Sequence, residues 1–96
     1  MTYKYPEYIS EIGEKHQLNR NKDRQLLATY LTADDGKDIL DIRVWKDGNP
    51  TLIGVFIYEG MANRLLLCLE KFIKLHEEKE SKLIENILEY DSFSEE

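Results

Sequence analysis

Residues 34–60, DDGKDILDIRVWKDGNPTLIGVFIYEG, hold two turns and two strand-like runs, and this stretch decides the fold. The tetrapeptide at 34–37, DDGK, is typical of a hairpin turn, because Asp-Gly readily adopts the positive φ angles that tight turns require. In residues 38–46 the side chains alternate between two faces, as they do in a β-strand. A second turn at 47–50 precedes another strand over 51–58. The pattern predicts two adjacent antiparallel strands.

The chain before this stretch adds at least one more strand. Residues 25–32 are rich in strand formers and predict a strand. Residues 17–24 are polar and basic and predict a loop. Residues 1–16 predict a short amphipathic helix, or an arm that docks onto another surface, because apolar side chains recur at helical spacing: Tyr5, Tyr8, Ile9 and Ile12. A fourth strand comes from either residues 17–24 or the N-terminal segment, and the sequence leaves both open.

The period of the apolar residues changes after Gly60 and predicts a helix over residues 61–75. Apolar residues resume after a polar stretch at 77–82, so either this helix continues or a second helix begins near Ser81. The order of elements predicts an α+β fold, an antiparallel meander of three to four strands followed by a long C-terminal helix. Because Leu65, Leu66, Leu67 and Leu69 nearly encircle the helix, we expect a homodimer through the helices.

Length and composition indicate one small domain without a membrane span. The 96 residues divide into an N-terminal arm or short helix with a basic loop (1–24), one meander-plus-helix domain (25–90) and an acidic tail (91–96). No window is apolar enough to span a membrane, and the start of the chain shows no secretory pattern. With a single cysteine, no internal disulfide forms. We expect a cytoplasmic or nucleoid protein, in the host cytoplasm if it is viral.

The residues that most enzymes need are missing, so we expect no catalytic activity, cofactor or metal. His16 and His76 lie 60 positions apart in polar segments and are expected at the surface. Cys68 falls in the apolar run of the helix, where a buried structural thiol is expected. The pair Asp34–Asp35 adjoins Gly36 and is expected to form a turn rather than bind a metal. No zinc-binding, phosphate-binding or serine-hydrolase motif is present.

One group of residues indicates a ligand. The alternation of residues 38–46 places Asp41, Arg43 and Trp45 together on the face expected to meet solvent, and neighbouring strands contribute Phe56 and Tyr30. Three aromatic rings on adjacent strands predict a platform on which unpaired bases stack, with Arg43 pairing with phosphate. Basic residues at strand ends and in loops are expected to follow the backbone: Arg20, Lys22, Arg24, Lys37 and Lys46. The alternative is that Trp45 and Phe56 pack beneath the N-terminal segment or at a dimer contact.

The net charge of −6 opposes nucleic-acid binding when the chain is taken as a whole. Its distribution is uneven, because residues 1–24 carry a balance of +1 and residues 59–96 carry −5. Most of the acidic surplus therefore lies in the C-terminal third, while residues 25–58, which hold the predicted strands, carry −2.

Residues 36–73 resemble the core of the positive-cofactor-four family of transcriptional coactivators and their bacterial and phage relatives. The similarity lies in Leu40-Asp41-Ile42-Arg43 followed by Trp45, in Gly54-Val55-Phe56-Ile57, and in the leucines of the helix. It implies a curved four-stranded sheet, a dimer through the helices, and single-stranded DNA bound across the sheet, with Arg43 and Trp45 on the DNA-facing strand. The chain departs from the family pattern at Ile53, where the family has a basic residue.

The combined reading is a single-stranded-DNA-binding protein of replication, recombination or transcription, with RNA as a possible further ligand. The alternative, from a different class, is an acidic protein-binding module or phage-type inhibitor or adaptor on the same scaffold, which does not bind DNA. A protein partner would then contact the acidic C-terminal helix or the tail at 91–96.

Overall fold

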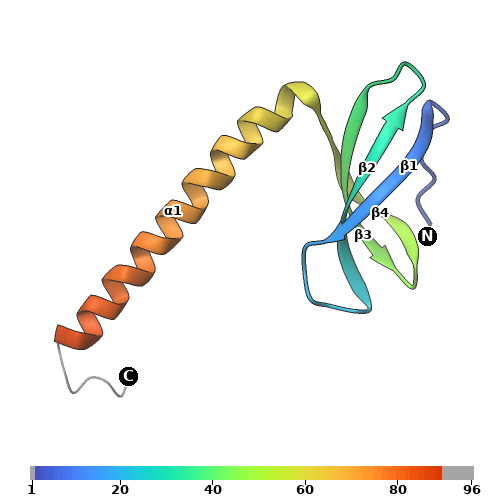
Figure 1. The fold of residues 1–96 in the computed structure, drawn as a ribbon. Coiled ribbons are helices and arrows are strands. Elements are labelled where there is room, and N and C mark those ends of the chain that lie inside the picture. The colour runs from blue at the N-terminus through green and yellow to red at the C-terminus, as the bar shows by residue number, and fades with distance from the viewer. Residues whose placement is uncertain (1, 90–96) are drawn as a thin grey trace. The chain divides into compact units, whose positions relative to one another are not determined.

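The structure, a computed structural model, describes residues 2–89, with side chains described as far as residue 81. Four strands precede one helix: β1 (Ile9–Gln17), β2 (Arg24–Ala33), β3 (Asp38–Lys46), β4 (Asn49–Tyr58) and α1 (Glu59–Glu89) (Figure 1). The chain divides between Ala62 and Asn63 into a sheet unit, which includes the first turn of α1, and a helix unit. This arrangement confirms the predicted α+β fold.

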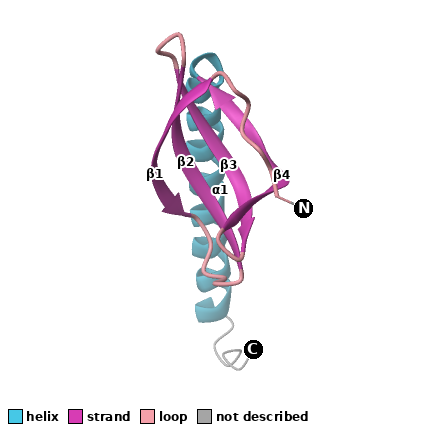
Figure 2. Ribbon diagram, turned by 90° about the vertical axis from the view of Figure 1, so that its right-hand side faces the viewer, coloured by secondary structure: helices cyan, strands magenta, loops and turns pink. Residues whose placement is uncertain are grey.

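The sheet is an antiparallel meander in which each strand pairs with its neighbours in the sequence, in the order β1-β2-β3-β4 (Figure 2). The turn between β2 and β3 lies where the Asp-Gly signal predicted it, and the Asp35 carboxylate accepts a hydrogen bond from the Lys37 amide. Between β3 and β4, Asp47 and Gly48 both have positive φ angles, 54° and 78°. Two such residues in succession are typical of a two-residue hairpin turn, whose twist matches that of the strands.

The fourth strand comes from the N-terminal segment, and the helix predicted for residues 1–16 is wrong. Ile9–Gln17 pairs with β2 as an edge strand, although the pairing shifts register between Ile9 and Glu11 and again between Ile12 and Lys15. These shifts mix apolar and polar side chains along the strand, which hides the period of two that marks a regular strand. Residues 2–8 cross the sheet without regular structure.

One continuous helix follows the sheet, so no second helix begins near Ser81. The polar residues at 77–81 are exposed along this helix. The predictions for the tail at 91–96 fall outside the described residues.

The two faces of the sheet differ in what lies over them. One face carries the cross-strand rows Leu31–Ile39–Tyr58, Thr29–Asp41–Phe56 and Leu27–Arg43–Gly54, and residues 2–8 cross it; we call it the covered face (Figure 2). The other carries Tyr30–Leu40–Ile57 and Ala28–Ile42–Val55, and we call it the open face.

The buried core of the sheet unit lies on the covered face. Leu31 and Ile39 are 1% and 4% exposed, and Ala33 joins them. Tyr5, Ile9 and Phe56 pack against this cluster. The N-terminal segment therefore closes the core that the four strands begin.

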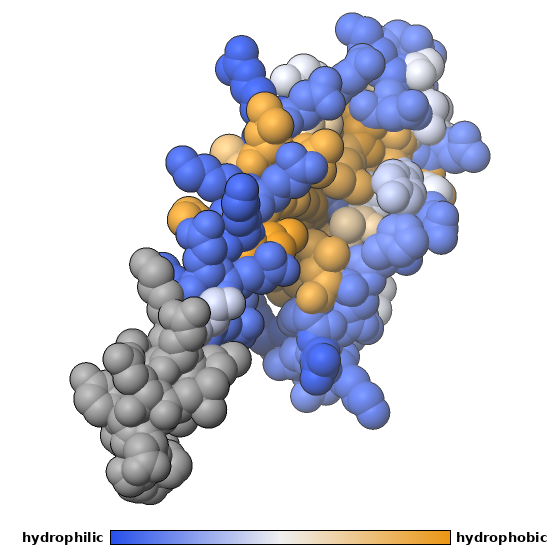
Figure 3. Space-filling model, turned by 60° about the vertical axis from the view of Figure 1, so that its left-hand side comes forward, coloured by the Kyte–Doolittle hydropathy of each residue, from blue (hydrophilic) through white to orange (hydrophobic). Residues whose placement is uncertain are grey.

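The open face keeps apolar side chains at the surface, and so does the described part of α1 (Figure 3). Val55 is 51% exposed on the sheet, and Leu67 and Phe72 are 65% and 67% exposed on the helix. Exposed apolar area of this kind marks a surface that contacts other molecules.

Candidate nucleic-acid interface

A buried ion pair occupies the centre of the covered face. Asp41 is fully buried and Arg43 is 4% exposed. The Arg43 Nε donates to both carboxylate oxygens of Asp41, at 3.2 and 3.0 Å, and Nη1 donates to the Thr51 carbonyl at 3.0 Å. Both charges are thus neutralised within the sheet unit, which buried charges require.

Two tyrosines of the N-terminal segment lie over this pair. The Tyr3 ring centroid is 3.7 Å from the Arg43 guanidinium carbon. The Tyr5 hydroxyl donates a 2.6 Å hydrogen bond to Asp41, and the Tyr5 ring lies 6.3 Å from Phe56 at an interplanar angle of 15°. Burial, followed by the bond to Asp41, raises the pKa of Tyr5 well above its usual range. Tyr5 therefore stays a neutral donor.

The strand opposite Arg43 is built to admit its side chain. Gly54 pairs with Arg43, and a Cβ at position 54 would lie 2.6 Å from the guanidinium carbon. The β3–β4 register then shifts before Trp45 pairs with Pro50. At this irregularity the Thr51 hydroxyl donates to the Val44 carbonyl at 2.7 Å, while the Thr51 carbonyl accepts from Arg43. A glycine inside a strand indicates such a close approach, so Gly54 is a signal of it in the sequence.

This geometry corrects the prediction that Asp41, Arg43 and Trp45 meet solvent together. Asp41 and Arg43 are buried, because the N-terminal segment crosses the face of the sheet that was expected to meet solvent. Phe56 is half-buried beside Tyr5, as the alternative reading of the sequence held. Tyr30 lies on the open face with its ring 5.5 Å from His16, so it shares no platform with Trp45 and Phe56.

Trp45 occupies the end of the covered face nearest the β1–β2 loop. The residue is half-buried, and its indole N–H has no hydrogen-bond partner among the described residues. The ammonium of exposed Lys15 lies 5.2 Å from the ring centroid, which is cation–π distance. Lys15 has no local signal in the sequence, because the spacing of its neighbours predicts a helix or arm rather than a strand.

The loop at residues 18–23 is held in one conformation by its own amides. The Asn21 side-chain oxygen accepts from the backbone amides of Asp23 and Arg24, at 2.8 and 3.0 Å. The Asn19 side chain accepts from the Leu26 amide and donates to the Arg24 carbonyl. The loop thus presents the exposed side chains of Arg20 and Lys22 from a fixed backbone, which reduces the ordering that a ligand must impose.

The predicted basic residues separate into two groups. Arg24 and Lys46 are opposite each other where β2 begins and β3 ends, so they join Arg20 and Lys22 at the Trp45 end. Lys46 also lines a hollow of about 290 Å³ with Thr2, Asn49 and Thr51. Lys37 lies in the turn at the opposite end of β2 and β3 and does not join them.

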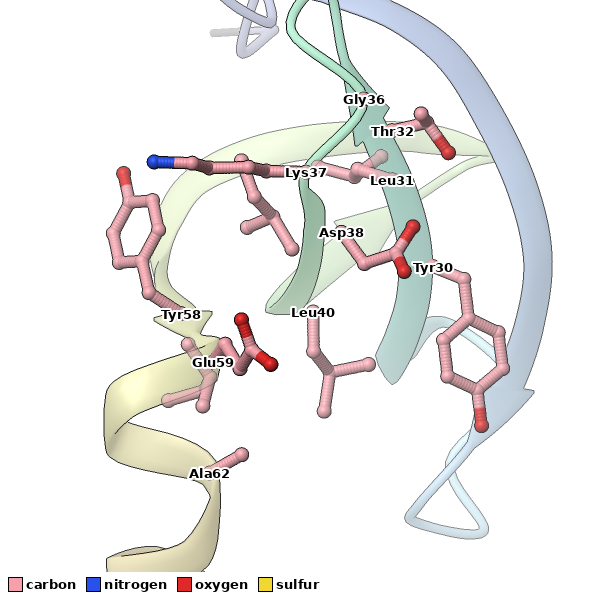
Figure 4. A pocket seen from close by; sticks show the side chains of 12 residues that line it. Tyr30, Leu31, Thr32, Gly36, Lys37, Asp38, Leu40, Tyr58, Glu59 and Ala62 are labelled. Carbon is pink, nitrogen blue, oxygen red and sulfur yellow. The ribbon is translucent and has the colours of Figure 1, made fainter.

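The open face has a hollow of its own, at the end where Lys37 lies. It measures about 740 Å³ and is lined by Leu40 and Ile57 from the strands, with Tyr30, Lys37 and Tyr58 around it (Figure 4). It lies across the sheet from the Arg43 pair, so the two cannot serve a single binding surface.

The two histidines and the cysteine that the sequence singled out are exposed. His16 and His76 are exposed, as predicted, and each lies near a glutamate, Glu14 and Glu80 respectively. Cys68 is exposed, so the expectation of a buried thiol is wrong.

Two broader searches of the structure gave negative results. Within residues 2–81, no cluster of three or more His, Cys, Asp or Glu side chains is placed to hold a metal ion. Nor does the described part of α1 contain a window apolar enough to cross a bilayer.

Comparison with protein-family models, with curated proteins and with solved structures finds no match to this chain.

Proposed function

We propose that this protein binds single-stranded nucleic acid, most readily DNA, at the Trp45 end of the covered face, and that it is not an enzyme. One observation carries the proposal: a half-buried tryptophan bears a lysine ammonium 5.2 Å from its ring and adjoins a hydrogen-bonded basic loop. Aromatic rings beside cations are how proteins hold flexible strands without reading their sequence. Such a protein would act in replication, recombination or transcription, in the cytoplasm or on the nucleoid.

In the proposed complex, the Trp45 ring binds a base and the basic side chains bind phosphates. A base stacks on the Trp45 indole and takes the place of the Lys15 ammonium, which then pairs with the adjoining phosphate. Arg20, Lys22, Arg24 and Lys46 bind the phosphates that follow. Stacking contributes about 1–3 kcal/mol per base, and each phosphate contact adds an electrostatic part that weakens with salt.

The local charge supports this assignment despite the overall sign. Residues 15–24 contain four basic side chains and one acidic side chain, Asp23. Most of the acidic surplus belongs to residues 59–96, which carry −5. The resemblance of residues 36–73 to the positive-cofactor-four family adds support for a sheet face as the binding surface, although the charge of Arg43 is committed to Asp41.

The same proposal includes a homodimer. The described helix exposes Leu66, Leu67 and Phe72, and an unpartnered apolar helix face is most often covered by a second copy. Sedimentation should report a dimer, and Leu67→Glu with Phe72→Glu should yield a monomer. A wild-type monomer at the concentrations used for binding would contradict this part.

The test uses Trp45 as its own reporter, because it is the only tryptophan in the chain. Titration with oligo-dT should quench or shift its emission with micromolar or tighter affinity at low salt, and the affinity should fall steeply as salt rises. Trp45→Phe should retain most of the affinity, measured with labelled oligonucleotide, and Trp45→Ala should lose about tenfold or more.

A matched pair of charge reversals locates the site. Lys22→Glu, at the Trp45 end, should weaken binding several-fold, whereas Lys37→Glu, at the opposite end of the sheet, should have a much smaller effect that long-range charge accounts for. Equal losses would contradict the location. No change in Trp45 emission at low salt, with no binding of labelled oligo-dT, would overturn the function.

A further inference from the structure

Residues 2–8 occupy the part of the covered face that continues from Trp45. Arg43 is two residues before Trp45 on the same face of β3, so their side chains start about 7 Å apart. That distance equals about two steps of a stacked strand, at 3.4 Å each. A nucleic acid lying on Trp45 therefore meets the N-terminal segment next.

The contacts of Tyr3 and Tyr5 are of the kind that bases make. The Tyr3 ring lies on the Arg43 guanidinium at 3.7 Å, and RNA-binding proteins stack unpaired bases on arginine planes in this way. Tyr5 lies nearly parallel to Phe56, at 15°. Two tyrosine rings thus fill positions over a cation and an aromatic side chain.

Few hydrogen bonds hold the segment in place, and its packing against the core cluster comes from Tyr5. Its backbone is tied to the sheet at its two ends, where the Tyr3 amide donates to the Pro50 carbonyl at 2.7 Å and the Tyr8 carbonyl accepts from Asp34 at 2.8 Å. Between these ends the Tyr5 hydroxyl provides the bond to Asp41. Segments with few backbone bonds are the ones that open locally while the rest of a fold persists.

We propose that residues 2–8 are an intramolecular competitor: they cover a second stacking subsite, formed by Arg43 and Phe56, which a bound single strand uncovers. This inference rests on the proposed function of the Trp45 end. A short strand occupies Trp45 alone and leaves Tyr3 in place. A longer strand replaces Tyr3 over the guanidinium, while the Asp41–Arg43 pair stays intact beneath it.

Competition of this kind reduces apparent affinity by the fraction of molecules in which the subsite is open. Weakening the cover should therefore tighten binding of long strands only. Tyr3→Ala removes a stacked cation–π contact, and we expect about a fivefold to tenfold gain in affinity for oligo-dT of about 16 nucleotides. For oligo-dT of about 4 nucleotides, affinity should stay within about twofold of wild type.

Two measurements accompany the titration. Tyr3→Phe keeps the ring and should behave as wild type at both lengths. In the wild-type protein, hydrogen exchange at the Tyr3 and Asp34 amides should accelerate when the long oligonucleotide is added and not when the short one is, because these amides hold the ends of the cover. Exchange in the wild type tests the inference even if Tyr3→Ala perturbs the fold.

The outcomes separate the two proposals. In one outcome, wild type binds both lengths through Trp45, Tyr3→Ala leaves long-strand affinity unchanged or lower, and the two amides stay protected. Residues 2–8 are then a fixed part of the fold. This inference fails in that case, and the proposed function stands. If wild type does not bind and Tyr3→Ala does, the competitor is supported. If neither binds, both proposals fail.

Discussion

Arg43 and Lys15 are both cations that contact an aromatic ring on the same face of the sheet, yet their surroundings differ. Arg43 is 4% exposed, bonded to Asp41 and to the Thr51 carbonyl, and covered by Tyr3 at 3.7 Å. Lys15 is exposed, lies 5.2 Å from the Trp45 ring and forms no ion pair within residues 2–81. The charge of the first cation is committed to the fold, and the charge of the second is available to a ligand.

The comparison shows that a residue's partners, rather than its type, assign its role. Arginine is the better phosphate ligand in general, because its planar guanidinium binds two oxygens at once. Here that capacity is used by the Asp41 carboxylate. The Lys15 ammonium is the less specific phosphate ligand, but its charge forms no ion pair within residues 2–81.

Removing Asp41 should have the largest effect on stability. Asp41→Ala leaves the Arg43 charge buried without its partner, and we expect a loss of about 3–5 kcal/mol in the free energy of unfolding. Urea unfolding followed by circular dichroism measures it. Asp38→Ala, an exposed position on the same strand, should change stability by no more than about 0.5 kcal/mol. A loss below about 1 kcal/mol for Asp41→Ala would show that the pair is not structural.

Gly54→Ala should also destabilise the fold, because it pushes on the same arginine from the other side. The new Cβ would lie 2.6 Å from the guanidinium carbon, so Arg43 must shift and strain its bonds. We expect a loss of about 1–3 kcal/mol in the free energy of unfolding. Gly60→Ala is the matched control: no atom lies within 4 Å of its added Cβ, and alanine favours the helix. Destabilisation by both substitutions alike would contradict the argument.

The strands and turns after residue 24 were predictable because local chemistry determines them. Asp-Gly pairs set both hairpins, and alternation in β3 fixed which side chains share a face. β1 was not predictable in this way, because its two register shifts, between Ile9 and Glu11 and between Ile12 and Lys15, remove the period of two on which the prediction depends.

The candidate site was predictable only in part, since it depends on contacts between distant residues. Alternation placed Arg43 and Trp45 on one face correctly, and the loop Arg20–Arg24 was recognised as basic. What alternation cannot say is which face is covered. Coverage comes from Tyr3 and Tyr5, nearly 40 positions before Arg43 and Asp41, and their packing has no local signal. Lys15 was missed for the same reason.

Tyr5→Phe tests how much the N-terminal segment stabilises the buried Asp41–Arg43 pair. The substitution removes a hydrogen bond to a buried carboxylate, and we expect a loss of about 1.5–3 kcal/mol in the free energy of unfolding at neutral pH. The pH dependence of the free energy of unfolding gives a second test. Because the pKa of Tyr5 is raised in the folded protein, its contribution is complete below the ordinary tyrosine pKa of about 10 and is lost as pH rises above it. Stability should fall between pH 9 and 11 more steeply in wild type than in Tyr5→Phe, and parallel curves would contradict the shifted pKa.

Lys15→Gln should have the smallest effect on stability and a clear effect on binding, which is the reverse of Asp41→Ala. An exposed cation–π contact contributes about 0.5–1 kcal/mol, so the free energy of unfolding should fall by no more than that. If Lys15 transfers from the indole to a phosphate when a base stacks, the variant should bind oligo-dT several-fold more weakly. The slope of log affinity against log salt should also decrease in magnitude by about 0.7, the share of one phosphate contact on a single strand. Lys37→Gln, with the same loss of charge at the far end of the sheet, should keep the wild-type slope. A large loss of stability in Lys15→Gln with an unchanged slope would place Lys15 with Arg43 as a structural cation and remove the distinction between the two.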